Sequence, residues 1–219
     1  MTKDIVIVGD GMSGKTSAIK VYLGKQFPSK YMPTICESHT KKVRLNGRPI
    51  SLQLWDTAVQ EDIEVFRPML YRKASVFIVM YSIDRPESLE NVYEKWTPEL
   101  RNYCPNVPII LVGNKMDRRQ LSSAHGQRWS KNDEVPVSSS TGREIARKIN
   151  AFAYKECSAL SGEGVKEIFQ VALQATQERK GQDPWKRLKD AMIPKACNKA
   201  NKSLACEKKK ITTETHSRN

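Results

Sequence analysis

The amino-acid sequence predicts an α/β fold in which helices cover both faces of a mostly parallel, six-stranded sheet. Three observations support this prediction. Short apolar runs alternate with segments of helical periodicity, which is the pattern of βαβ units. Two of these runs, Ile5–Val8 and Val76–Met80, are continuously apolar, as expected for strands buried on both faces of a sheet. A glycine-rich turn joins the first run to the first helical segment.

Short apolar segments are expected to form the strands, at residues 4–8, 40–45, 49–55, 76–81, 109–112 and 153–157. Each is short and carries β-branched, aliphatic or aromatic residues. Asn46-Gly47 separates the second strand from the third, and this dipeptide is the strongest short-range signal for a β-hairpin. We therefore expect these two strands to form a hairpin.

Helical periodicity predicts helices up to about residue 23, at 87–103, around 142–152 and at 165–177. In the second of these, Leu89, Val92, Tyr93 and Trp96 are expected to share one apolar face. Residues 56–72 and 118–141 are polar and are expected to be irregular. The serine-rich part of the second stretch contains few strong helix formers, so we do not expect a helical effector site there.

The chain has 219 residues, which fits one domain at about 1–178, with an insert at about 118–141, and a tail at 179–219. The tail holds 12 Lys and Arg against 4 Asp and Glu, so it carries +8 of the net charge of +13. Its composition predicts flexibility. A basic tail suggests anionic lipid or nucleic acid. We do not expect nucleic-acid binding, because aromatic residues do not interleave with the basic ones.

The sequence also argues against several classes of protein. The apolar runs are far shorter than the ~20 residues of a membrane span, and the first predicted strand begins too early to leave room for a signal peptide. The five cysteines are scattered, without CxxC pairs or the Cys/His spacing of a metal site. These features predict a reduced, cytoplasmic protein.

The glycine-rich turn at Gly9–Thr16 fits the phosphate-binding pattern GxxxxGK[ST] and lies between a predicted strand and helix. Glycines let the backbone wrap around phosphate oxygens, while successive N–H groups and the helix N-terminus attract the anion. Lys15 is expected to reach the β- and γ-phosphates, and Thr16 to ligate Mg²⁺. The nucleotide contacts expected here are Gly9, Asp10, Gly11, Met12, Ser13, Gly14, Lys15, Thr16 and Ser17.

Three further motifs follow predicted strands. Asp56 can hold Mg²⁺ directly or through water, although taken alone it could equally be a turn or capping residue. Asp117, in Asn114-Lys115-Met116-Asp117, can accept two hydrogen bonds from guanine that adenine does not offer, which argues against an ATPase or kinase. The fourth motif is Glu156–Leu160. All four lie at carboxyl ends of strands, where open α/β sheets bind ligands.

With these motifs, residues 3–178 resemble the Ras superfamily, and specifically the Rac-like branch of its Rho family. The matching segments are Gly9–Thr16, Phe27–Ile35, Leu54–Ala58, Arg67-Pro68, Lys95–Leu100, Gly113–Asp117 and Glu156–Leu160. The long segment between Asp117 and Glu156 resembles the Rho insert. The resemblance implies the Ras-like G domain of the P-loop NTPases, which binds GTP or GDP with Mg²⁺ and hydrolyses GTP to GDP and phosphate.

The resemblance also assigns roles to single residues. It implies that Gln60 orients the attacking water, and that Thr34 ligates Mg²⁺ and senses the γ-phosphate, so that Gln60, Lys15 and Thr34 form the catalytic set. Phe27 and Lys115 would pack against the guanine, and the Ala159 N–H would contact its oxygen. The further expected nucleotide contacts are Asp56, Ala58, Val59, Asn114, Asp117, Ser158 and Leu160.

The expected partners are those of a Rho-type signalling switch. Effectors would bind the loop Tyr31–Glu37, called switch I, and a second loop after Asp56, called switch II. Exchange factors and GTPase-activating proteins would drive the nucleotide cycle through order and disorder of these loops. The resemblance implies a role in the actin cytoskeleton, cell polarity or membrane traffic, and we expect a monomer.

Val59 departs from the family pattern, because the resembling proteins carry glycine there. Valine is β-branched and disfavours positive φ, so we expect slow GTP hydrolysis or weak coupling of switch II to the γ-phosphate. The alternatives are a largely GTP-loaded scaffold, or neighbours that absorb the change. Gly11 is retained, which leaves room for the arginine of an activating protein.

The C-terminus also departs from the family pattern, because no cysteine stands four residues from the end. CaaX prenylation is therefore not expected. Cys197 and Cys206 are candidates for palmitoylation or simply tail cysteines. The tail could attach peripherally to the plasma membrane or endomembranes through its charge and through an apolar helical face formed by Trp185, Leu188 and Met192. A fully solvated tail is the alternative.

Overall fold

The computed structural model describes residues 2–28, 36–57, 67–119 and 135–178. Within these residues, six strands form one sheet in the order β2-β3-β1-β4-β5-β6. Only β2 and β3 pair antiparallel; the other neighbours run parallel. The strands are β1 (Thr2–Val8), β2 (Cys36–Leu45), β3 (Arg48–Thr57), β4 (Val76–Ser82), β5 (Ile109–Asn114) and β6 (Ala153–Glu156). The predicted mostly parallel α/β fold is confirmed.

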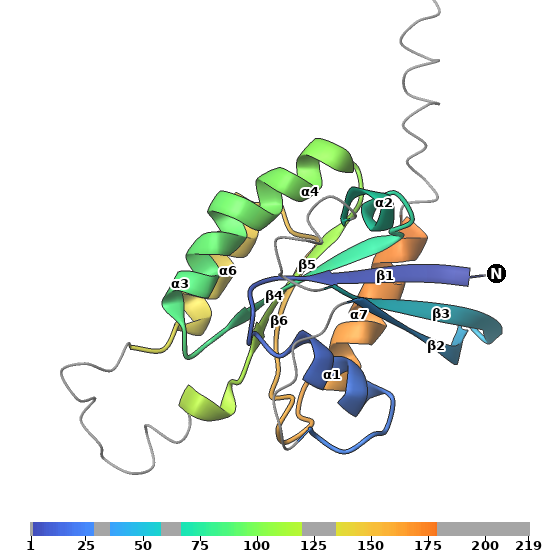
Figure 1. Ribbon diagram of the computed structural model, residues 1–219, viewed down its shortest axis with the longest axis horizontal. Coiled ribbons are helices and arrows are strands. Elements are labelled where there is room, and N and C mark those ends of the chain that lie inside the picture. The colour runs from blue at the N-terminus through green and yellow to red at the C-terminus, as the bar shows by residue number, and fades with distance from the viewer. Residues whose placement is uncertain (1, 29–35, 58–66, 120–134, 179–219) are drawn as a thin grey trace, which may run out of the picture. The chain divides into compact units, whose positions relative to one another are not determined.

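Helices cover both faces of this sheet. In Figure 1, α1 and α7 lie on one side, and α3, α4 and α6 on the other. The helical elements are α1 (Lys15–Tyr22), α2 (Arg67–Tyr71), α3 (Pro86–Asn91), the π-helical segment η2 (Val92–Trp96), α4 (Thr97–Tyr103), α6 (Ser139–Lys148) and α7 (Val165–Glu178). No helix within the described residues combines the length and the apolar composition that a membrane span requires.

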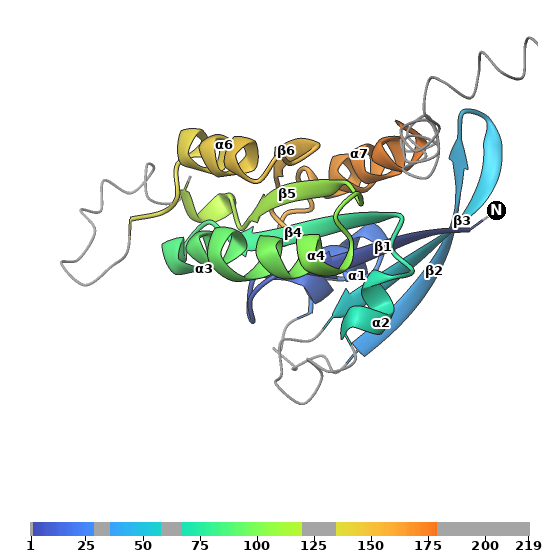
Figure 2. The ribbon, with the colours of Figure 1, turned by 90° about the horizontal axis from the view of Figure 1, so that it is seen from above.

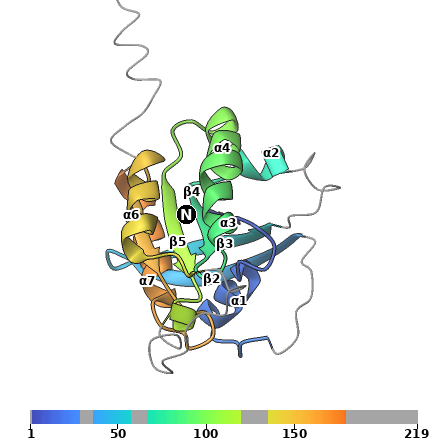
Figure 3. The same ribbon diagram turned by 90° about the vertical axis from the view of Figure 1, so that its left-hand side faces the viewer.

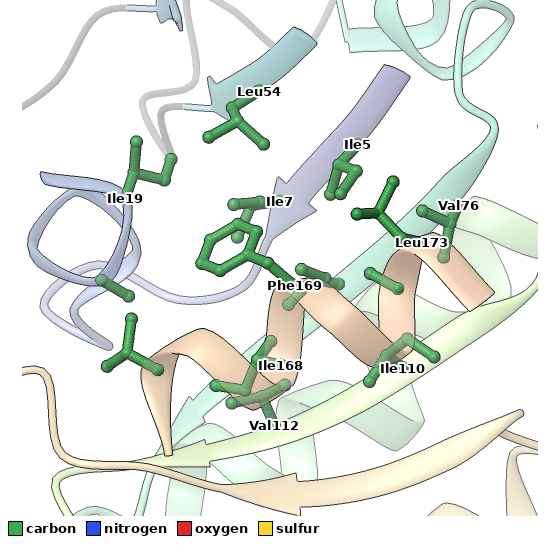
Figure 4. Close-up of a cluster of buried hydrophobic side chains, with 14 of the residues drawn as sticks. Ile5, Ile7, Ile19, Leu54, Val76, Ile110, Val112, Ile168, Phe169 and Leu173 are labelled. Carbon is green, nitrogen blue, oxygen red and sulfur yellow. The ribbon is translucent and has the colours of Figure 1, made fainter. Parts of the chain in front are cut away.

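The two faces of the sheet form two separate apolar clusters, because successive side chains of a strand point to opposite sides. Ile5 and Ile7 of β1 belong to the cluster that includes residues of α1 and α7, whereas Val6 and Val8 belong to the one that includes residues of α2, α3, α4 and α6. Figure 4 shows Phe169 of α7 over the first face. All residues of β4 and β5 are buried, as their continuous apolar runs predict.

The hairpin prediction is also confirmed. β2 and β3 are joined at Asn46 and Gly47, whose φ angles of 50° and 76° are both positive, as a tight hairpin turn requires. Both strands extend beyond the predicted bounds. The hairpin and β6 form the opposite edges of the sheet (Figure 2). Asp56 therefore belongs to the end of β3 and not to an irregular stretch.

Three predicted elements need correction. Residues 56–72 are not uniformly irregular, since α2 forms at Arg67–Tyr71. Residues 86–103 are helical as expected, but the wide turn of η2 changes the angular spacing of the side chains, and Tyr93 is 52% exposed. The helix expected at 142–152 is α6 at Ser139–Lys148, because Ser138 caps it by accepting a hydrogen bond from the Thr141 N–H.

Two glycines permit close packing between β4, β5, β6 and α6. A Cβ on Gly142 would lie 2.2 Å from the Tyr154 hydroxyl and 2.6 Å from the Tyr81 hydroxyl, and one on Gly113 would lie 2.7 Å from the latter. We expect Gly142→Ala to lower the free energy of unfolding by about 1–3 kcal/mol through overpacking. Urea denaturation measures this effect. An unchanged midpoint for Gly142→Ala would contradict the prediction.

Candidate nucleotide-binding site

The predicted phosphate loop joins β1 to α1 at the edge of the sheet where the parallel strands end, which faces the viewer in Figure 3. Gly9 and Gly14 have φ angles of 137° and 91°. A Cβ on Gly9 would lie 2.0 Å from the Met80 carbonyl oxygen, and one on Gly14 would lie 2.1 Å from the Asn114 side chain. Only glycine fits this backbone path. Because Gly14 precedes α1, no side chain caps the helix N-terminus.

Lys15, the first residue of α1, is buried against the backbone of this loop. Its Nζ donates hydrogen bonds to the carbonyl oxygens of Gly9 and Asp10, both at 2.8 Å. Burial lowers the pKa of Lys15 to about 8, and the carboxylates of Asp56 and Asp10 act in the opposite direction. The loop thus encloses a buried amine, which a bound anion would favour in its charged form.

Asp56 at the end of β3 is fully buried beside β1, where its Cα partner is Ile7. Among the described residues, neither of its carboxylate oxygens has a hydrogen bond of ordinary geometry. Burial raises the pKa of Asp56, while the nearby Thr16 hydroxyl and the Lys15 ammonium lower it. A buried, unsatisfied carboxylate next to a hydroxyl provides the oxygen ligands that Mg²⁺ prefers, so these residues fit a magnesium site.

Asn114 connects three of the predicted motifs. Its Nδ2 donates to the Ser13 carbonyl oxygen at 2.8 Å, and its Oδ1 accepts from the Ala159 N–H at 3.0 Å. The Ala159 N–H, expected to contact guanine, therefore has a protein partner in this structure. Asp117 Oδ1 accepts from the Ser158 hydroxyl at 2.5 Å. These bonds align the loops after β5 and β6 with the phosphate loop.

The remaining predicted contacts around these loops differ in exposure. Met12, Phe27 and Leu160 are 58%, 41% and 61% exposed. Lys115 has a φ of 66° and donates to both carboxylate oxygens of Asp84, at 3.1 and 3.2 Å. The predicted residues Thr34, Ala58, Val59 and Gln60, and most of Tyr31–Glu37, lie outside the described residues.

Three polar side chains that no sequence motif predicts as partners of Glu156 donate hydrogen bonds to its carboxylate, at the carboxyl end of β6. Arg119 donates to both oxygens of Glu156, at 2.9 and 3.1 Å, and Ser139 donates to the same carboxylate at 2.9 Å. The Tyr154 hydroxyl donates to it as well. Burial acts to raise the pKa of Glu156, but the hydrogen bonds donated by Arg119, Tyr154 and Ser139 together lower it. These residues share no motif or periodic spacing, so no sequence signal would have paired them.

Comparison with known proteins agrees with this geometry. A family model described as "Ras family" matches residues 4–178, which is most of the chain. The matched region contains the phosphate loop, Asp56, the Asn114–Asp117 motif and the loop after β6. Proteins of this family bind guanine nucleotide with Mg²⁺ and act as switches. The chain belongs to the Ras family of small GTPases.

Proposed function

We propose that this chain is a Rho-type, Rac-like switch that binds GTP with Mg²⁺, hydrolyses it slowly and engages effectors through its switch loops. The observation that carries the proposal is the side chain of Asn114. It bonds to the phosphate loop at Ser13 and to the loop after β6 at Ala159, so the phosphate and base contacts belong to one preorganised site. The Rac-like assignment depends on the segments Phe27–Ile35 and Lys95–Leu100.

Direct binding tests this proposal. Fluorescent GDP should bind the purified chain with Mg²⁺ present, and unlabelled GDP and GTP should displace it where ATP does not. Removing Mg²⁺ with a chelator should speed GDP release, since Asp56 and Thr16 would lose the cation that joins them to the phosphates. Failure to bind GDP or GTP, or a preference for ATP, would overturn the proposal.

A largely GTP-loaded scaffold is the second candidate, and Val59 favours it. Because valine disfavours the backbone conformations open to glycine, Val59→Gly should raise the single-turnover rate of GTP hydrolysis by about 10–100-fold. Ala58→Gly is the matched control, since it adds a glycine next to the position without restoring the pattern. Equal rates for the wild type and Val59→Gly would refute this account. Mostly GTP in the purified wild type would favour the scaffold.

We further propose a cytoplasmic location for the domain at 1–178, with the basic tail at 179–219 contacting anionic membrane. The charge of the tail supports this, at about 1 kcal/mol per basic residue near the surface. Co-sedimentation with vesicles containing anionic lipid should exceed that with neutral vesicles and fall with salt. No binding at moderate salt would remove the membrane proposal. Exchange factors, activating proteins and cytoskeletal effectors are the proposed partners.

A further inference from the structure

The phosphate loop contains one carboxylate, that of Asp10, whose hydrogen-bond donors lie outside the loop. Asp10 Oδ1 accepts a hydrogen bond from the Trp96 indole N–H at 2.7 Å, and its Oδ2 accepts one from Asn91 Nδ2 at 2.7 Å. Both donors come from the continuous helical stretch 86–103. Bonds to an ionised acceptor are roughly twice as strong as neutral ones. The carboxylate is therefore firmly attached to this helix.

The backbone of the same residue faces the other side. The Asp10 carbonyl oxygen accepts from Lys15 Nζ at 2.8 Å, and Asp10 lies between Gly9 and Gly11. Glycines leave the chain conformationally free, and that freedom must be lost when the loop wraps an anion. Because hydrogen bonds already hold Asp10 in place, the loop loses less conformational entropy when it binds an anion.

Trp96 is placed for this contact by the π-helical segment η2, which it ends. The indole is fully buried, and the Arg67 guanidinium lies 5.2 Å from its ring centroid. Arg67 in turn pairs with Glu99 at 3.4 Å, and the Tyr71 hydroxyl donates to the same carboxylate at 2.7 Å. Because the ring is enclosed by these groups, its N–H has a fixed direction.

We propose that Trp96 is a positioning residue for phosphate binding: its indole N–H, together with Asn91, holds Asp10 and so presets the phosphate loop. This inference rests on the proposed nucleotide binding. The expected effect is on binding of the β-phosphate, because a loop of this kind wraps the terminal phosphates. The base is expected to bind elsewhere, near Asp117. Loss of the N–H should therefore weaken GDP more than GMP.

Trp96→Phe tests the proposal, because phenylalanine keeps a buried ring beneath Arg67 and removes the N–H. We expect the ratio of GDP affinity to GMP affinity to fall about tenfold, as for a charge-assisted hydrogen bond. Asn91→Ala, which removes the second donor to Asp10, should also lower this ratio. It provides the test if Trp96→Phe does not fold. In the background of Asp10→Asn, Trp96→Phe should have a smaller effect, since the two residues act as a pair.

Trp55→Phe is the matched control. Trp55 also donates its indole N–H to a carboxylate, at 3.0 Å to Asp4 Oδ1, but on β3 and away from the loop. It should lower stability without changing the GDP to GMP ratio. If the wild type binds GDP but the ratio of GDP to GMP affinity is unchanged in both Trp96→Phe and Asn91→Ala, the inference is overturned. If the wild type does not bind GDP, the proposed function itself fails.

Discussion

Replacing Lys15 by methionine is expected to weaken GDP and GTP binding by about 10²–10⁴-fold, because each charge-assisted hydrogen bond contributes about 1.5–3 kcal/mol. Lys15 is buried within the loop and its ammonium already bonds to two loop carbonyls. Phosphate oxygens entering the loop would meet this cation in a site of low dielectric constant, where its attraction is strongest. Methionine keeps a similar volume and removes the ammonium group, with both its charge and its hydrogen-bond donors.

The same substitution should change how stability depends on pH. The folded chain holds Lys15 with a pKa of about 8, against 10.5 for the ordinary side chain. Between these values the unfolded chain binds a proton that the folded chain does not, so the wild type gains stability as pH rises. Relative to Lys15→Met, the free energy of unfolding of the nucleotide-free wild type should increase by about 3 kcal/mol from pH 7.5 to 10.5.

Equilibrium dialysis with labelled GDP and urea denaturation at two pH values measure the two effects. Lys20→Met is the matched control, since Lys20 lies in the last turn of the same helix and outside the loop. It should bind GDP like the wild type. GDP affinity retained in Lys15→Met would contradict the first expectation, and parallel pH profiles for wild type and variant would contradict the second.

Asp117→Asn is expected to reverse the choice of base. A carboxylate offers two acceptors, which suit the N1–H and 2-amino groups of guanine. Asparagine offers one acceptor and one donor, which suit the N1–H and 2-oxo groups of xanthine. The Ser158 hydroxyl donates to Asp117 Oδ1 at 2.5 Å. Rotating the asparagine amide cannot remove the mismatch with guanine, because either orientation places its NH₂ group against one of the two guanine donors.

We expect GDP affinity to fall about 10²–10⁴-fold in Asp117→Asn, since a polar group is left unpaired in the site. Xanthosine diphosphate should become the better ligand in competition with fluorescent GDP. Asp84→Asn serves as the control, because it removes a carboxylate next to Lys115 without altering the base-reading pattern. A guanine preference that survives Asp117→Asn would show that other groups select the base.

Local residue patterns predict the strands of the sheet, the hairpin and the residue types of the site. Continuous apolar runs predict strands buried on both faces, and Asn46-Gly47 predicts the hairpin, because such preferences depend on neighbours in the chain. The phosphate loop is local in the same sense: Gly9 and Gly14 have the positive φ angles that its pattern requires. The Ras-family match covers the same motifs.

Contacts between polar groups that are distant in the chain depend on the packing of the whole domain. Asp10 and Trp96, and likewise Arg119 and Glu156, are far apart in the chain and share no periodic spacing. Their contacts follow from the strand order and from the wide π-helical turn of η2. The apolar pattern of the sequence does not predict that turn. Side-chain pairing depends on register and on the packing of whole elements, which the local chain does not encode. The motifs therefore identify the groups that would bind a nucleotide, while the fold decides how firmly they are held.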